Sequence, residues 1–144
     1  MLMEFKDIHM GIMIKTRVVE ESIEIDRICN FLKCTEDQVN EMYKAQSLDT
    51  HILLRWSKLL EYDFFRIYSQ HLILYAPQAG HHQEEPGKNS ALPKFRKHLY
   101  TKEIIDFILG EIHSGAMTKK RVTEVYKIPR STLHKWLNKY GSDQ

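Results

Sequence analysis

The sequence predicts an all-α protein with two small helical domains joined by a flexible linker. Apolar residues recur three and four positions apart in successive short segments, and no segment shows the alternation typical of a strand. A stretch rich in Pro, Gly and polar residues, 77–93, interrupts the helical pattern as linkers do. The 144 residues are enough for two small domains. We therefore expect a five-helix domain at 1–76 and a three-helix domain at 94–144.

Two amphipathic helices open the first domain. They are expected at about 10–21 and about 24–32, where apolar residues share one helical face. The expected inward positions are Ile8, Ile12 and Val19 in the first helix, and Ile25, Ile28, Cys29 and Leu32 in the second.

Capping residues mark the starts of the next three helices. Thr35 and Gln38 form a capping box for the third, Asp49 can cap the fourth and Asp63 the fifth. The expected core positions are Val39, Met42, Tyr43, Leu53, Trp56, Leu59, Leu60, Phe64, Phe65, Ile67 and Tyr68. The apolar run from Leu72 to Tyr75 is either the tail of the fifth helix or an extended segment, and it could cover the core or meet a second subunit.

Five short helices with a helix-turn-helix at the second and third resemble the lambda-repressor/Cro-type domain over residues 8–72. Cys29 stands where that family prefers Ala, and Lys33 where it prefers Gly. The third helix would read DNA in such a domain, but three acids among its exposed positions would repel phosphate. Those positions are Glu36, Asp37, Asn40, Glu41 and Lys44. We therefore expect a packing scaffold or dimerisation unit here.

The net charge of +2 hides a division between the two ends of the chain. Residues 1–76 carry 9 Lys and Arg against 12 Asp and Glu, whereas residues 88–144 carry 12 against 5. Contacts to phosphate supply most non-specific DNA affinity. The C-terminal end is therefore the expected nucleic-acid surface, and Lys94, Arg96, Lys97 and His98 could form an arm on the DNA.

The second domain shows three helical segments. Thr101 can cap the first, Gly115 can end it, and Thr118 can cap the second. Ile104, Ile105, Ile108, Leu109 and Ile112 form the stripe of the first helix, and Ile128 should plug the turn before the third. In the third, Leu133, Trp136, Leu137 and Tyr140 should be buried. Ser131, Lys135 and Asn138 should point outward, with His134 and Lys139 on the flanks.

Two short helices joined at Lys127-Ile128-Pro129 form a helix-turn-helix. Tyr126, Ile128-Pro129, Ser131-Thr132-Leu133 and Trp136 resemble the pattern of insertion-sequence transposase and pipsqueak-type helix-turn-helix domains over residues 99–140. The resemblance implies recognition of duplex DNA by the third helix. Lys127 stands where most relatives have Gly, so the turn must close without a residue at ease with positive φ.

The resemblance places base-reading positions at Arg130, Ser131, Thr132 and Lys135, and we add His134 to the predicted base contacts. The predicted phosphate contacts are Lys119, Lys120, Arg121, Lys127, Asn138 and Lys139.

We expect no catalytic residues, no metal and no cofactor. No nucleophile and base gather in the sequence, nor does any motif of three carboxylates that transposase chemistry needs. Cys29 and Cys34 lack the spacing of a zinc site, and His81-His82 read as solvated. The N-terminus is unlike a signal peptide, so we expect a cytoplasmic, nucleoid-associated protein without a membrane contact.

The sequence thus predicts a duplex DNA-binding protein, an insertion-sequence accessory protein without a catalytic domain. Its expected partners are double-stranded DNA, a second copy bound through the N-terminal domain, and a separate transposase catalytic subunit. A transcriptional regulator with two helix-turn-helix units is one alternative, and a helical interaction or adaptor protein without a DNA role is another.

Overall fold

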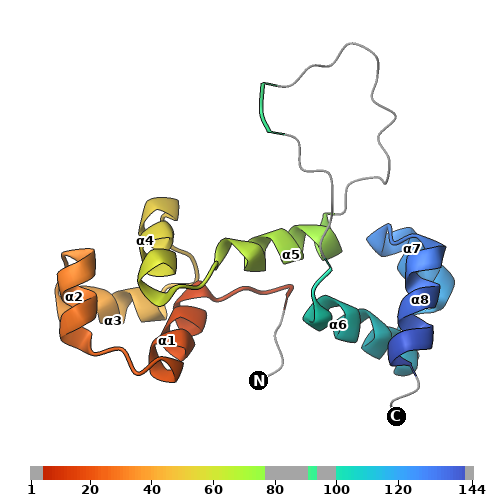
Figure 1. Ribbon diagram of the computed structural model, residues 1–144, viewed down its shortest axis with the longest axis horizontal. Coiled ribbons are helices and arrows are strands. Elements are labelled where there is room, and N and C mark those ends of the chain that lie inside the picture. The colour runs from red at the N-terminus through yellow and green to blue at the C-terminus, as the bar shows by residue number, and fades with distance from the viewer. Residues whose placement is uncertain (1–4, 77–90, 94–99, 142–144) are drawn as a thin grey trace. The chain divides into compact units, whose positions relative to one another are not determined.

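The computed structural model describes residues 5–76, 91–93 and 100–141. Throughout these residues the regular structure is helical (Figure 1). The helices are α1 (Met10–Glu20), α2 (Ile25–Leu32), α3 (Glu36–Lys44), α4 (Thr50–Leu60), α5 (Phe65–Tyr75), α6 (Lys102–His113), α7 (Lys119–Tyr126) and α8 (Arg130–Tyr140). The predicted all-α fold class is confirmed.

The chain separates into two compact units, Leu2–Ser69 and Gln70–Gln144, with the division inside α5. The domain boundaries expected at residues 76 and 94 therefore stay predictions. Most of the expected linker, including His81-His82, and the basic stretch 94–99 lie outside the described residues.

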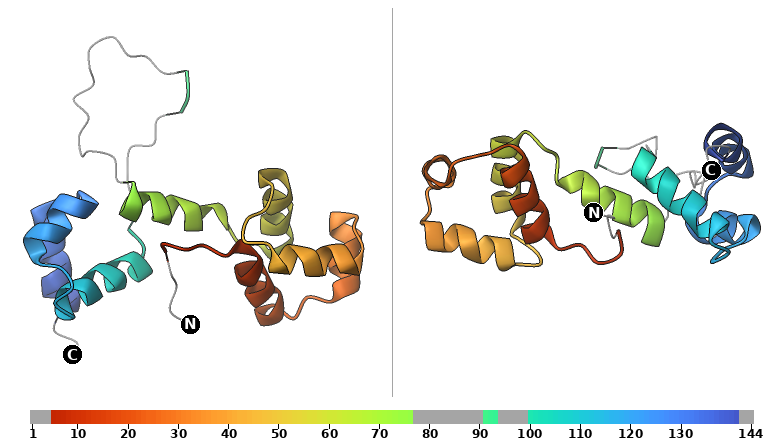
Figure 2. Two further views of the ribbon diagram at one scale, coloured as in Figure 1. Left: turned by 180° about the vertical axis from the view of Figure 1, so that it is seen from behind. Right: turned by 90° about the horizontal axis from the view of Figure 1, so that it is seen from below.

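The first unit has a continuous apolar core. α1 packs against α3 and α4, and α2 packs against the same two helices (Figure 2). The predicted positions Ile28, Val39, Leu53, Trp56 and Phe64 are all nearly inaccessible to solvent. The predicted caps are confirmed as well, since Thr35 Oγ1 accepts from the Gln38 amide at 3.3 Å and Asp49 Oδ1 from the His51 amide at 2.8 Å. The Gln38 side chain completes the capping box by accepting from the Thr35 amide at 2.9 Å.

Two of the inward positions predicted for the first helix are wrong, whereas Ile8, just before α1, is partly buried against the core. Ile12 and Val19 are 48% and 67% exposed, whereas Met10, Gly11, Ile14 and Val18 are buried. The amides of Met10 and Gly11 donate to the carbonyls of Gln46 and Ala45 at 2.9 and 3.0 Å. A Cβ on residue 11 would lie only 2.4 Å from the Tyr43 carbonyl oxygen, so only glycine allows this approach. The contact turns the Gly11 side of α1 inward and the Ile12 side outward.

The apolar run Leu72 to Tyr75 belongs to α5 and is helical, which decides against an extended segment. Asp63 Oδ1 accepts from the Phe65 amide at 3.1 Å at the start of this helix, as its predicted capping role requires.

Candidate nucleic-acid interface

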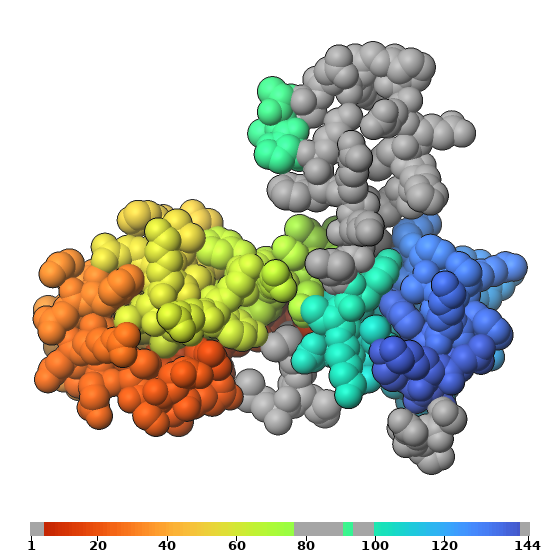
Figure 3. All heavy atoms as spheres, viewed as in Figure 1, coloured from red at the N-terminus to blue at the C-terminus, as the bar shows by residue number. Residues whose placement is uncertain are grey.

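The helices α6, α7 and α8 pack against one another in pairs and form the frame of the candidate interface (Figure 3). The predicted stripe of α6 is buried at Ile104, Ile105, Ile108 and Leu109. Val122, Tyr126, Ile128, Leu133 and Trp136 complete this core. Leu137 and Tyr140, which were also expected in the core, are only half-buried.

Local hydrogen bonds fix the ends of these helices. Thr101 Oγ1 accepts from the Ile104 amide at 3.5 Å, and Thr118 Oγ1 from the Arg121 amide at 3.1 Å. Gly115 takes a positive φ of 78° just after α6, which confirms its predicted role in ending the helix. Ile128 is 1% exposed and fills the turn as expected.

The turn between α7 and α8 places a lysine in the left-handed conformation. Lys127 has φ 53° and ψ 35°, so this turn closes through a residue that is not at ease with positive φ, as expected. The turn after α2 repeats the feature, since Lys33 has φ 57° and ψ 48°. Gly adopts this conformation at less cost than Lys, so the surrounding structure must hold both lysines in it.

The solvent-facing side of α8 carries donors and cations but no acid. Ser131, His134, Lys135 and Asn138 are exposed along the helix, with Arg130 and Lys139 at the borders of this face. Thr132 is half-buried beside the core. The 11 residues of α8 contain neither Asp nor Glu, so nothing on this helix repels phosphate.

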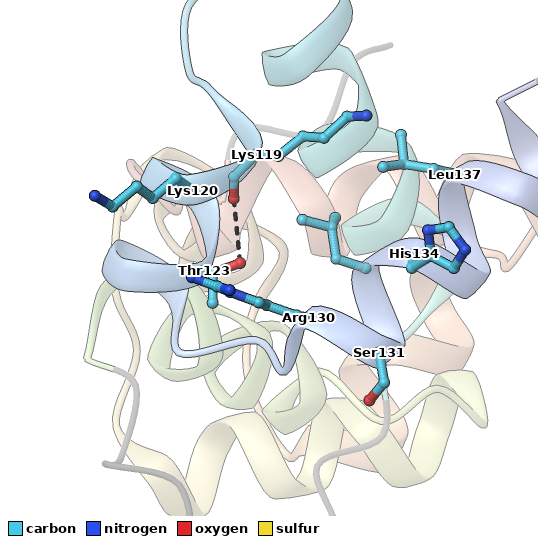
Figure 4. Close-up of a pocket in the computed structure, with 8 residues that line it drawn as sticks. Lys119, Lys120, Thr123, Arg130, Ser131, His134 and Leu137 are labelled. Atoms are coloured by element: carbon cyan, nitrogen blue, oxygen red, sulfur yellow. Dashed lines mark hydrogen bonds between the residues drawn. The ribbon is translucent and has the colours of Figure 1, made fainter.

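A groove of about 560 Å³ separates α7 from α8 (Figure 4). Its lining brings together five predicted contacts, namely Lys119, Lys120, Arg130, Ser131 and His134. Leu133 and Leu137 supply apolar surface, and Thr123 was missed by the sequence analysis. Thr123 follows Lys119 by one helical turn, and its Oγ1 donates to the Lys119 carbonyl at 3.1 Å. Helical spacing from Lys119 is the signal that could have found it.

The remaining predicted contacts lie outside this groove, and three of them have neighbours on their own helix. Arg121 Nη1 lies 3.9 Å from Glu124 Oε2, and both side chains are more than half exposed. Lys139 Nζ lies 5.2 Å from the centre of the Tyr140 ring. Asn138 Nδ2 is 3.2 Å from His134 Nε2. The weak exposed pair leaves Arg121 accessible to a ligand.

Trp136 belongs to the core, as predicted. It is 8% exposed, and its ring meets that of Tyr100 edge to face at a centroid distance of 5.0 Å. Burial raises the pKa of the Tyr100 hydroxyl above its ordinary value. Burial also raises the pKa of Tyr126, to which the Glu111 carboxylate adds. These aromatic rings therefore stabilise the frame and are not a platform for stacking bases.

The N-terminal unit shows a different surface on α3. Glu36, Asp37, Asn40, Glu41 and Lys44 are exposed as expected, and Lys44 Nζ lies 3.1 Å from Glu41 Oε1. A groove of about 530 Å³ beside α3 is bordered by Asp37 and Glu41 and by the cations Lys33 and Arg55. Burial and the nearby Cys29 raise the pKa of the Cys34 thiol in this groove, so the thiol is a poor nucleophile.

Within residues 5–76, 91–93 and 100–141, no three His, Cys, Asp or Glu side chains gather as a metal site would require. Over the same part of the chain, no helix combines the length and apolar composition needed to cross a bilayer. Comparison of the chain with protein-family models, with curated proteins and with solved structures gives no match.

Proposed function

We propose that this protein binds duplex DNA and reads its sequence through α8. The observation that carries the proposal is the exposed, acid-free face of α8 beside a groove that holds Lys119, Lys120 and Arg130. A cationic surface without acids suits the phosphate backbone, and polar side chains on an exposed helix suit base edges.

The dimensions of α8 fit the major groove of B-DNA. A helix with its side chains is about 10–12 Å wide, and the major groove is about 12 Å wide. Arg130, at the first turn of α8, is able to donate two hydrogen bonds to guanine O6 and N7. Lys119 and Lys120, at the first turn of α7, then lie beside the positive end of a helix dipole, where phosphate is favoured.

The wider role proposed here is that of an insertion-sequence accessory protein without a catalytic domain. The resemblance of residues 99–140 to transposase helix-turn-helix domains supports this role. The N-terminal unit then serves for self-association, and a separate transposase subunit supplies the chemistry. The exposed acids of α3 support the assignment of DNA contact to α7 and α8 and not to α3.

A helical adaptor protein is the second candidate. The groove beside α3 favours it, because Leu32, Met42 and Ile52 give it apolar surface of the kind that protein partners bury. Under this alternative the full chain binds no duplex at low salt.

Selection of bound duplexes from a random pool by the full chain tests the proposal. A sequence reader enriches a defined site, and Arg130→Ala or Lys135→Ala should relax one position of it at a cost of about 1–3 kcal/mol. Lys119→Ala should lower affinity evenly across sequences. Lys58→Ala is the matched control, because Lys58 is an exposed lysine on α4. Absence of any enriched site would remove sequence reading from the proposal.

A further inference from the structure

Two side chains on the exposed face of α8 are joined to each other. Asn138 Nδ2 lies 3.2 Å from His134 Nε2, one helical turn earlier. An amide nitrogen carries two hydrogens and accepts none, so the ring nitrogen must be the acceptor in this pair. This contact orients the Asn138 amide.

The Asn138 amide keeps two hydrogen-bonding groups that His134 does not use. One N–H of Asn138 is used by His134, which leaves the carbonyl oxygen and the second N–H for a ligand. Adenine presents the complementary pattern in the major groove, namely an N6 amino donor beside the N7 acceptor. Guanine presents two acceptors there and would leave the amide oxygen without a donor.

The position of Asn138 suits a base contact. Ser131, His134, Lys135 and Asn138 are spaced at i, i+3, i+4 and i+7 and are all exposed. Seven residues of helix span about 10 Å, which matches about three base-pair steps of 3.4 Å. Asn138 therefore lies about three steps along the groove from Ser131. Lys139, its cationic neighbour on α8, is exposed and suits a contact to the adjacent backbone.

We propose that Asn138 reads adenine in the major groove and that His134 is the positioning residue that orients its amide. The inference rests on the proposed function and adds a specificity to it. It also moves Asn138 from the predicted phosphate contacts to the base contacts.

The test uses the full chain in the same selection from a random duplex pool. Wild type should enrich one position as A·T that Asn138→Ala no longer enriches, with a discrimination of about 5- to 150-fold at that position. His134→Leu removes the acceptor and should erase the same position while the rest of the site is still enriched. His134→Gln keeps an acceptor one turn before Asn138 and should restore the preference.

Base analogues then test the contact itself. Replacing the adenine by 7-deazaadenine removes the N7 acceptor. It should weaken the binding of the wild-type protein several-fold and leave the binding of Asn138→Ala unchanged. If Asn138→Ala lowers affinity evenly across all sequences, Asn138 is a phosphate contact. That result would overturn this inference and leave the proposed function intact. If His134→Gln loses the A·T preference as completely as His134→Leu does, His134 does not have the positioning role. If wild type enriches no site, the proposed function fails and this inference with it.

Discussion

Replacing Lys127 by Gly should stabilise the unit formed by α6, α7 and α8. Lys127 has φ 53° and ψ 35°, a conformation that costs an L-residue about 1–2 kcal/mol. Glycine adopts it without a clash but loses about 0.5–1 kcal/mol more through the entropy of the unfolded chain. The net gain is about 0.5–1 kcal/mol, which corresponds to a rise in Tm of about 2–8 °C for a small domain.

The two tryptophans of the chain make each unit separately observable. Trp56 lies in the core of the first unit and Trp136 in that of the second, so their indole N–H signals in NMR spectra follow the two unfolding transitions. Lys127→Gly should raise the Trp136 midpoint only. Lys33→Gly is the matched variant, because Lys33 has φ 57° and should raise the Trp56 midpoint only.

Lys127→Ala separates the backbone from the side chain. It keeps the Cβ and therefore the conformational cost, so it should bring none of the gain seen with Gly. An equal gain from Ala, or an unchanged Trp136 midpoint with Gly, would refute the reasoning.

Three further changes test the core, the charge and the packing of α1. Trp136→Ala should destabilise its unit by about 3–5 kcal/mol in urea unfolding followed by circular dichroism, and a folded but non-binding variant would instead make Trp136 a stacking residue. If wild type neutralises about 4–6 phosphates, its log K should fall with log salt at a slope of about −4 to −5 in titrations of the selected duplex. The double variant Lys119→Ala/Lys120→Ala should make this slope shallower by about 2. An unchanged slope would place both lysines away from the DNA backbone. Gly11→Ala should lower the free energy of unfolding by about 1–3 kcal/mol, because the new Cβ is forced onto three carbonyl oxygens. Gly110→Ala, in open space on α6, should raise it by about 0.5–1 kcal/mol. An unchanged stability of Gly11→Ala would contradict the close approach.

Local sequence determined where the helices lie and which of their ends are capped. The capping box of Thr35 and Gln38 and the caps at Thr101 and Thr118 each join residues within three positions of one another, so no tertiary contact is needed to form them. Helical spacing likewise identified Trp136 as core, and the position of Ile128 in the turn identified it as the plug. The exposed donors of α8 were predictable for the same reason, since a helix that buries one face must present the other.

Tertiary packing decided what the spacing of residues leaves open. The rotation of α1 depends on Gly11 meeting carbonyls more than thirty positions away, a contact that outweighs the burial of Ile12 and Val19 and leaves no local signal. The groove that joins Lys119 and Thr123 to Arg130 exists only because α7 and α8 pack against each other. The left-handed conformation of Lys127 has the same origin: sequence alone disfavours it by about 1–2 kcal/mol, and the burial of the flanking Tyr126 and Ile128 offsets that cost.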